Sequence, residues 1–357
     1  MAKPVGYLPT LDGWRAFAVM AVVFCHVSFG ANVQAKFPHW LFSVMDGGGI
    51  KGVQLFFAIS GFLITSRLIE EWNCFGRISL KRFYVRRVFR ILPPAMTYLL
   101  VIALLGLLGV VPFHWKEWLS AVCFFRNYMA LGGAYFIESH YWSLSIEEQF
   151  YLIWPALLVL SGLYRARYTA SIIILALWIW RWVAFHHIGG ATIGEGGWWR
   201  SEICFDSLLV GCLYALALES PAVKKWFSKY LSVWAVAAIL VLIFATGGTW
   251  TPSGRTIQST LMPLLIIATV LNPHTWLGRL LEIPVIRWVG RLSYSLYIWQ
   301  ELFTLQRMFP WYPLQFVALF GVAALSFYGL EKPFMKWGYR LAPPPSLGHN
   351  DLRAKRR

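Results

Sequence analysis

The sequence predicts an all-α, polytopic membrane protein with about ten transmembrane helices and both termini in the cytoplasm. Of the 357 residues, 58% are hydrophobic and only 13% are charged, whereas a soluble domain carries about 25% charged residues. Apolar runs of about 20 residues, the length that crosses a bilayer, recur along the whole chain. The expected helices are 14–30, 50–68, 91–111, 142–161, 169–186, 203–219, 231–246, 257–272, 289–307 and 314–330.

The distribution of charge predicts the orientation. A formal net charge of +16 would suit nucleic-acid binding, but most of the 32 Lys and Arg residues fall in alternate loops and in the tail. This asymmetry follows the positive-inside rule and puts both termini in the cytoplasm, so no nucleic-acid partner is expected. The loops expected on the opposite side contain only Lys36, Lys51, Lys116, Arg126, Arg200 and Arg255.

The chain is expected to form one membrane domain, residues 1–342, followed by a basic, disordered cytoplasmic tail, residues 343–357. No small-residue cleavage site follows the first apolar run, so a cleavable signal is not expected. The five cysteines are scattered without a CxxC pair. We therefore expect neither a disulfide framework nor a metal site.

Two ionisable residues flank the first apolar run, LDGWRAFAVMAVVFCH. Arg15 and His26 are close to three helical turns apart, so they share a helix face and lie about 16 Å apart along the axis. Arg15 is expected at the cytoplasmic edge, where its planar fork suits a phosphate. His26 is expected deep in the membrane, where desolvation favours a neutral imidazole that can take a proton. The spacing alone leaves a second interpretation open, in which Arg15 snorkels as an anchor and His26 only bonds a neighbouring helix.

A second group lies in HYWSLSIEEQFYLIWP, at the outer end of an expected span. Glu147 and Glu148 are adjacent, so they cannot both face lipid and at least one points into the bundle. That carboxylate has either a chemical role or a structural ion pair with an intramembrane arginine such as Arg181 or Arg291.

A third group lies in RISLKRFYVRRVFRILPP. Arg82, Arg86 and Arg90 recur every four residues and share a helix face. A basic amphipathic segment at the cytoplasmic surface favours anionic lipid headgroups as its partner. Clustered arginines would also attract the phosphates of a nucleotide cofactor.

Taken together, these segments resemble the integral-membrane acyltransferase family three, bacterial enzymes that O-acylate mainly sugars. The resemblance covers nearly the whole chain, from residue 8 to about 335, with its motifs in the family order. They are LDGWRAFAVMAVVFCH with its R-x10-H spacing, GVQLFFAISGFLIT, FYVRRVFRILPP, YWSLSIEEQFYLIWP, FDSLLVG, GRLSYSLYIWQ and LEKPF. The glycines of GVQLFFAISGFLIT most simply predict tight helix packing.

The resemblance implies a multi-pass enzyme of the bacterial cytoplasmic (inner) membrane, with acetyl-CoA or another acyl-CoA as co-substrate. The acceptor is a sugar or glycopolymer hydroxyl, on a carrier lipid or free. The motifs carry over residue by residue. The expected catalytic residues are His26, Arg15 and Glu147; the CoA-binding residues are Arg15, Arg86, Arg87 and Arg90; and the acceptor-binding residues are Trp142, Ser143 and Asp206.

The hypothesis is that His26 acts as general base on the acceptor hydroxyl, which attacks the acyl thioester. Glu147 would orient His26 or bind the acceptor. Direct transfer is favoured over an acyl-enzyme, because Cys25 and His26 are adjacent on a helix and point about 100° apart. Two alternatives remain open: a transporter or exporter without acyl-transfer chemistry, and an acyl carrier serving a separate transferase. The sequence leaves open the acceptor, the acyl chain and the membrane face on which the acceptor lies.

Overall fold

The computed structural model describes residues 7–28, 39–129, 137–187, 197–246, 251–304 and 312–343, and for residues 28, 39–46, 312 and 313 no side chain is described. The expected tail, residues 343–357, lies outside this part of the chain except for its first residue. All regular structure in the described ranges is helical, as the sequence predicts. The main helices are α1 (Pro9–Ser28), α3 (His39–Phe75), α4 (Leu80–Leu107), α5 (Trp115–Val122), α6 (Tyr141–Ser161), α7 (Leu163–His187), α9 (Ser201–Ala217), α10 (Pro221–Tyr230), α11 (Val233–Ala245), α12 (Pro252–Leu271), α13 (Trp276–Leu281), α14 (Pro284–Thr304), α15 (Tyr312–Ser326) and α16 (Lys332–Leu341). Short helical turns cover Arg126–Tyr128, Gly197–Trp199 and Phe327–Glu331.

Six of the described helical segments are long and apolar enough to cross a membrane, which indicates a multi-pass membrane protein. A seventh candidate arises if α9 and α10, which meet at a bend of 111°, count as one span. Helices α6 and α14 form where spans were expected, but polar side chains make them less apolar than these six. The number of ten spans and the orientation therefore stay predictions.

Glycines let the central helices approach closely, as GVQLFFAISGFLIT predicts. A Cβ on Gly61 of α3 would lie 2.0 Å from the carbonyl oxygen of Leu208 in α9, and one on Gly211 would lie 2.6 Å from that of Ala58. Only a residue without a side chain fits at such contacts, which bring two helix backbones together in a membrane.

Helices α1 and α14 lie side by side and run in the same direction. Gly290, early in α14, packs on the backbone of Asp12, early in α1, and Glu301, late in α14, lies close to His26, late in α1. The late turns of the two helices therefore meet at the same level of the bundle.

Helix α4 joins two segments that the sequence analysis had separated, because the expected span began only at residue 91. It starts at Leu80, capped by Ser79, and continues through Pro93 and Pro94 without a break. The prolines remove the backbone donors to the carbonyls of Phe89 and Arg90, and the hydroxyl of Thr97 adds a hydrogen bond to the Pro93 carbonyl at 2.7 Å in the next turn. The expected surface arginines thus belong to a helix whose later turns enter the bundle.

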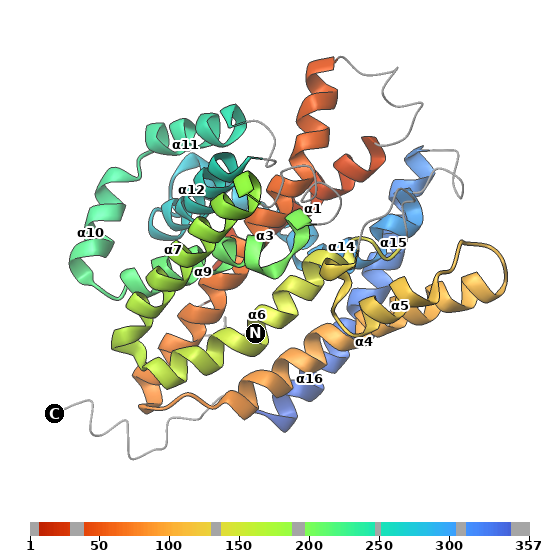
Figure 1. Cartoon of the computed structure of the whole chain (residues 1–357), viewed down its shortest axis with the longest axis horizontal. Coiled ribbons are helices and arrows are strands. Elements are labelled where there is room, and N and C mark those ends of the chain that lie inside the picture. Colours follow the sequence, from red (N-terminus) through yellow and green to blue (C-terminus); the bar gives the residue numbers. More distant parts are fainter. Residues whose placement is uncertain are drawn as a thin grey trace.

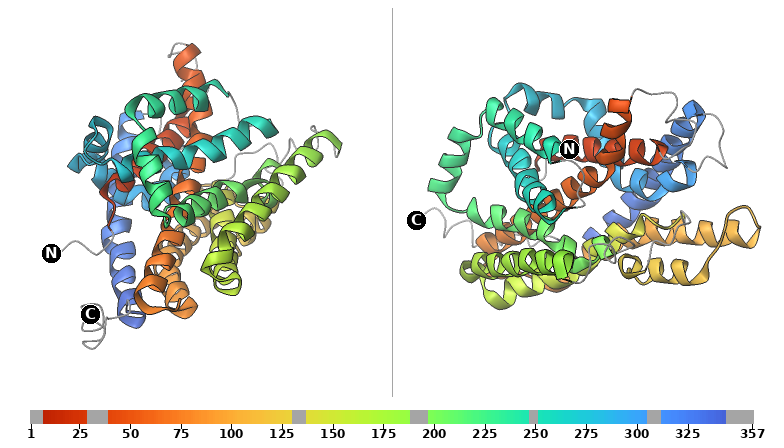
Figure 2. Two further views of the ribbon diagram at one scale, coloured as in Figure 1. Left: turned by 90° about the vertical axis from the view of Figure 1, so that its left-hand side faces the viewer. Right: turned by 45° about the horizontal axis from the view of Figure 1, so that its top comes forward.

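In Figure 1, α1, α3 and α14 occupy the middle of the molecule, with α4 and α5 extending to one side and α10 and α11 to the other. The second view in Figure 2 shows α6 and α7 side by side along one face. The central helices position the candidate site.

Candidate active site

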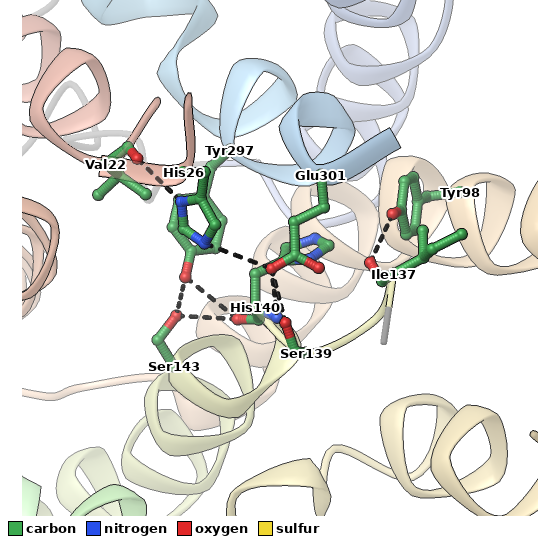
Figure 3. A network of polar contacts seen from close by, with 9 residues as sticks. All are labelled: Val22, His26, Tyr98, Ile137, Ser139, His140, Ser143, Tyr297 and Glu301. Carbon is green, nitrogen blue, oxygen red and sulfur yellow. Dashed lines mark hydrogen bonds and ion pairs between the residues drawn. The ribbon is translucent and has the colours of Figure 1, made fainter. Parts of the chain in front are cut away.

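His26 faces Glu301 inside the bundle (Figure 3). Nε2 of His26 lies 3.4 Å from Oε1 of Glu301. The side chain of His26 is 26% exposed, whereas that of Glu301 is only 6% exposed. The imidazole is therefore partly accessible, while the carboxylate beside its Nε2 is buried.

The turn that precedes α6 holds the carboxylate of Glu301 in place. Oε1 accepts hydrogen bonds from the Ser139 hydroxyl at 2.7 Å and from the His140 backbone N–H at 3.1 Å. Oε2 lies 3.1 Å from Nδ1 of His140, whose side chain is 1% exposed. A buried carboxylate is costly unless it is hydrogen-bonded and paired, and these contacts meet that requirement while fixing its orientation.

The backbone determines which nitrogen of His26 is basic. Nδ1 lies 2.9 Å from the carbonyl oxygen of Val22, and a carbonyl oxygen can only accept, so we assign the proton to Nδ1. Nε2 then carries the lone pair and faces Glu301. If Nε2 takes a proton, the carboxylate beside it accepts the new N–H and stabilises the imidazolium; unlike in a Ser-His-Asp triad, it lies on the same nitrogen as the base, so the acceptor hydroxyl must approach Nε2 beside Glu301.

Two hydroxyl groups extend this network. The hydroxyls of Ser143 and Tyr297 hydrogen-bond to each other, and both lie within hydrogen-bond distance of the His140 carbonyl oxygen, at 3.3 Å and 3.1 Å; the hydroxyl that accepts in the mutual bond is free to donate to that carbonyl. Ser143, expected to bind the acceptor, thus belongs to the neighbourhood of His26 and Glu301 (Figure 3). Its contact with the acceptor stays a prediction.

The expectation that Glu147 orients His26 is wrong for this structure. Glu147 accepts a hydrogen bond from Ser60 at 2.7 Å and interacts electrostatically with Arg87 and Arg15. On α6 it lies two turns from the turn that contacts Glu301, so its carboxylate faces the arginines instead. The residue that meets His26 is Glu301.

Three of the four arginines expected to bind CoA come together. Arg15 interacts electrostatically with Arg90 and Arg87, and Glu331, from the turn before α16, interacts with Arg90 and Arg15. Arg87 also lies over the ring of Tyr151, 4.3 Å from its centroid. Carboxylates thus partly balance a cluster of positive charge at the level of Arg15, about three helical turns from His26.

Arg86 points elsewhere. Its guanidinium donates to the Ala342 carbonyl at 3.2 Å and lies 4.0 Å from a carboxylate oxygen of Glu71. It links α4 to α3 and to the end of α16, so the structure does not bring it to the Arg15 cluster. CoA binding by Arg86 is therefore not supported by its position.

The other two residues expected to bind the acceptor lie in closely packed surroundings. Trp142 is largely buried, 4.3 Å from Trp199 and 6.3 Å from Phe57 between ring centroids. Asp206 is fully buried and lies 2.6 Å from a guanidinium nitrogen of Arg181. Asp206 thus has a partner in the protein and is not part of the His26 network.

The turn beside the site contains another buried carboxyl, Glu138, which is 2% exposed. Burial raises the pKa of Glu138 to about 7, and the positive charge of Arg126 opposes that shift. Burial also lowers the pKa of the Arg126 guanidinium. Glu138 can therefore change its charge near neutral pH, one residue from Ser139.

Sequence reasoning missed Glu301 and His140. Glu301 follows directly after the motif GRLSYSLYIWQ, and an acidic residue late in an expected span is itself an indication of a site. His140 begins HYWSLSIEEQFYLIWP, but no helical spacing relates it to residues of α14. No group of three or more His, Cys, Asp or Glu side chains among the described residues is arranged so that it could hold a metal ion.

The comparisons with known proteins agree with this picture. A protein family described as an acyltransferase domain matches residues 8–332. The chain is 28% identical to the peptidoglycan O-acetyltransferase OatA of Listeria monocytogenes, over 93% of this chain and 56% of that protein. It is also 28% identical to the O-acetyltransferase OatA of Staphylococcus aureus, over 94% of this chain and 58% of that protein. The chain thus spans less than two thirds of these relatives, and no solved structure matches it. The family match over nearly its whole length confirms the resemblance seen in the motifs: the chain belongs to this acyltransferase family.

Proposed function

We propose that the protein is a membrane-bound O-acyltransferase that moves an acyl group, by default acetyl, from cytoplasmic acyl-CoA to a hydroxyl of a sugar or glycopolymer. The observation that carries this proposal is the reachable imidazole of His26 backed by the buried carboxylate of Glu301. The names of the relatives, which include a peptidoglycan O-acetyltransferase, favour a saccharide acceptor. The inner membrane of a bacterium is the proposed location.

In the proposed reaction, Nε2 of His26 takes the proton of the acceptor hydroxyl. The hydroxyl oxygen bonds to the thioester carbon, the carbon–sulfur bond breaks, and the thiolate of CoA recovers the proton from the imidazolium. Glu301 stabilises that imidazolium, and the hydrogen bonds from Ser139 and His140 keep the carboxylate aligned. General-base catalysis of this kind contributes about 10²–10⁴-fold.

The donor would bind with its phosphates at the other end of α1. Arg15, Arg87 and Arg90 lie near one another there. Arginine suits phosphate because its guanidinium is planar and presents pairs of N–H donors to the phosphate oxygens. The separation of about 16 Å along α1 between Arg15 and His26 matches a donor whose thioester sits on a long flexible arm. His26 would then meet the thioester, while the arginines hold the charged end.

The test is turnover by the purified full chain in lipid nanodiscs, with labelled acetyl-CoA and glycan fragments as acceptors. We expect acetyl ester to accumulate on the glycan, and His26→Ala to slow it by about 10²–10⁴-fold. Cys25→Ala, beside His26, and His186→Ala, an exposed histidine on α7, should retain activity. Undiminished transfer by His26→Ala would refute the mechanism, and glycan flux without acetyl-CoA consumption would instead support an exporter.

A further inference from the structure

A surface separate from the His26 and Arg15 clusters combines an apolar cavity with a basic helix. The cavity has a volume of about 90 Å³ and lies between α11, α12 and α13. Apolar side chains form most of its wall: Leu231, Val236, Ala237, Leu240, Trp276 and Leu277. None of these residues belongs to the site described above.

The cavity suits a hydrocarbon ligand. Its two threonines use their hydroxyls within the protein, because Thr269 accepts from the indole of Trp14 at 2.9 Å and Thr275 donates to the Asn272 carbonyl at 2.9 Å. Because these hydroxyls are already hydrogen-bonded within the protein, the wall gives a water molecule few hydrogen-bond partners. Cavities of this kind stay dry or take apolar ligands. Part of one acyl chain matches such a cavity in size and polarity.

Helix α10 leads directly into the cavity wall and has two unlike faces. Phe227 packs edge-on against Tyr214 of α9, 5.8 Å between ring centroids, and anchors the helix to the bundle. The other face exposes Lys224, Lys225 and Lys229, none of which forms an ion pair with a described residue. Lys229 lies two residues before Leu231, the first residue of the cavity wall, so positive charge adjoins the cavity.

The position of α10 fits a membrane interface. It turns away from α9 by 111° and runs along the edge of the bundle in Figure 1. Trp226 and Tyr230 are exposed beside its lysines, and exposed aromatic rings next to lysines are typical of helices that lie at the headgroup level. The positive-inside expectation puts this end at the cytoplasmic leaflet, whose anionic lipids attract lysines.

We propose that this surface binds an anionic phospholipid, with its phosphate against the lysines of α10 and one acyl chain in the cavity beside Leu231 and Trp276. Both parts are needed for the assignment: the cavity selects hydrocarbon, and the lysines select negative charge. Exposed Trp276, at the mouth of the cavity, would cover the chain near the glycerol. The proposal does not depend on the acyltransferase chemistry, because lipid binding is measured without turnover.

The test uses the full chain in nanodiscs containing a phosphatidylglycerol or a phosphatidylcholine with a photoreactive group on one acyl chain. Peptide mapping should find the phosphatidylglycerol label within residues 231–240 and 268–277. Substituting Lys224, Lys225 and Lys229 together by Gln should reduce that labelling at least about tenfold, because each lysine near a charged surface contributes roughly fivefold. Ala237→Phe, which fills the cavity from an exposed position, should remove the label from these segments.

The control removes three exposed charges from segments expected on the same, cytoplasmic side, by changing Lys81, Arg165 and Arg167 to Gln. It should leave labelling of the two segments unchanged. Equal labelling by phosphatidylcholine, or equal loss in the control, would show that the surface does not select an anionic headgroup there. Labelling that survives Ala237→Phe would refute the placement of the chain in the cavity. Monodisperse elution of each variant verifies folding.

Discussion

Two groups of ionisable side chains lie inside the bundle, and they differ in whether their members can exchange a proton near neutral pH. One is the His26–Glu301–His140 group, in which both partners of the carboxylate are imidazoles. The other joins α7, α9 and α12, where Arg181 lies 2.6 Å from Asp206. An imidazole gains or loses a proton near neutral pH, whereas an arginine stays charged.

The two groups also differ in how deeply their side chains are buried. In the second group, Asp206 also accepts from the indole of Trp178 at 3.0 Å, and Arg255 donates to the Trp198 carbonyl at 3.1 Å and to the Cys204 sulfur at 2.8 Å. Arg181, Arg255 and Asp206 are at most 1% exposed, whereas His26 is 26% exposed. A charge inside a membrane protein is therefore not by itself evidence of catalysis. The candidate site differs from the Arg181–Asp206 group in two ways: its histidine is partly accessible, and that histidine can exchange a proton near neutral pH.

The largest effect that tests this comparison is expected from Glu301→Gln. Removing the carboxylate beside Nε2 leaves the imidazolium without its partner, and loss of the carboxylate that pairs with a catalytic histidine lowers turnover by up to about 10⁴-fold. Acetyl transfer by the purified variant measures this, with Glu219→Gln, an acidic residue bonded to Asn73, as the control. Normal turnover by the Glu301→Gln variant would contradict the view that the His26–Glu301–His140 group is catalytic and the Arg181–Asp206 group is structural.

Asp206→Asn should affect stability instead. The substitution leaves Arg181 buried without its counter-charge, which costs about 3–5 kcal/mol. Thermal unfolding in detergent measures the loss, and activity per folded molecule should stay near that of the unmodified protein. A KM for the acceptor that rises without loss of stability would favour the acceptor-binding role expected from the sequence.

Arg15→Gln should weaken the binding of the acetyl-CoA donor rather than slow the acyl-transfer step. Charge-assisted hydrogen bonds contribute about 1.5–3 kcal/mol, so the KM for acetyl-CoA should rise roughly tenfold to a hundredfold. Arg86→Gln is the matched control, because the structure directs that arginine to Ala342 and Glu71. Equal effects of both substitutions would argue against a specific phosphate site at Arg15.

Glu138 gives the smallest effect, a pH dependence of stability. Burial raises the pKa of Glu138 from 4.5 to about 7, so the folded state holds this proton more tightly than the unfolded state. Its contribution is complete below about pH 4.5 and is lost as the pH rises through about 7. Glu138→Gln should flatten the melting temperature across this range, whereas Glu219→Gln should not; an unchanged slope in the Glu138 variant would contradict the assignment.

The sequence predicted the helices better than their contacts. Length and hydropathy located α1, α7 and α12 because they depend on local composition, and the helical period put Arg15 and His26 on one helix. Glu301 was missed, and the role of orienting His26 was assigned to Glu147 instead. The partner of His26 depends on the parallel packing of α1 and α14, and residue spacing within one segment does not show how two helices pack. The same limit applies to Asp206, whose partner Arg181 lies on a different helix.

The central claim is that His26 and Glu301 act as one unit, and a double-mutant cycle tests it most directly. Turnover is measured for His26→Ala, Glu301→Gln and the double variant, each verified as folded. Because the carboxylate acts only through the imidazole, the double variant should be no slower than His26→Ala alone. Losses that simply multiply would contradict the account, since they would show that the two residues contribute independently.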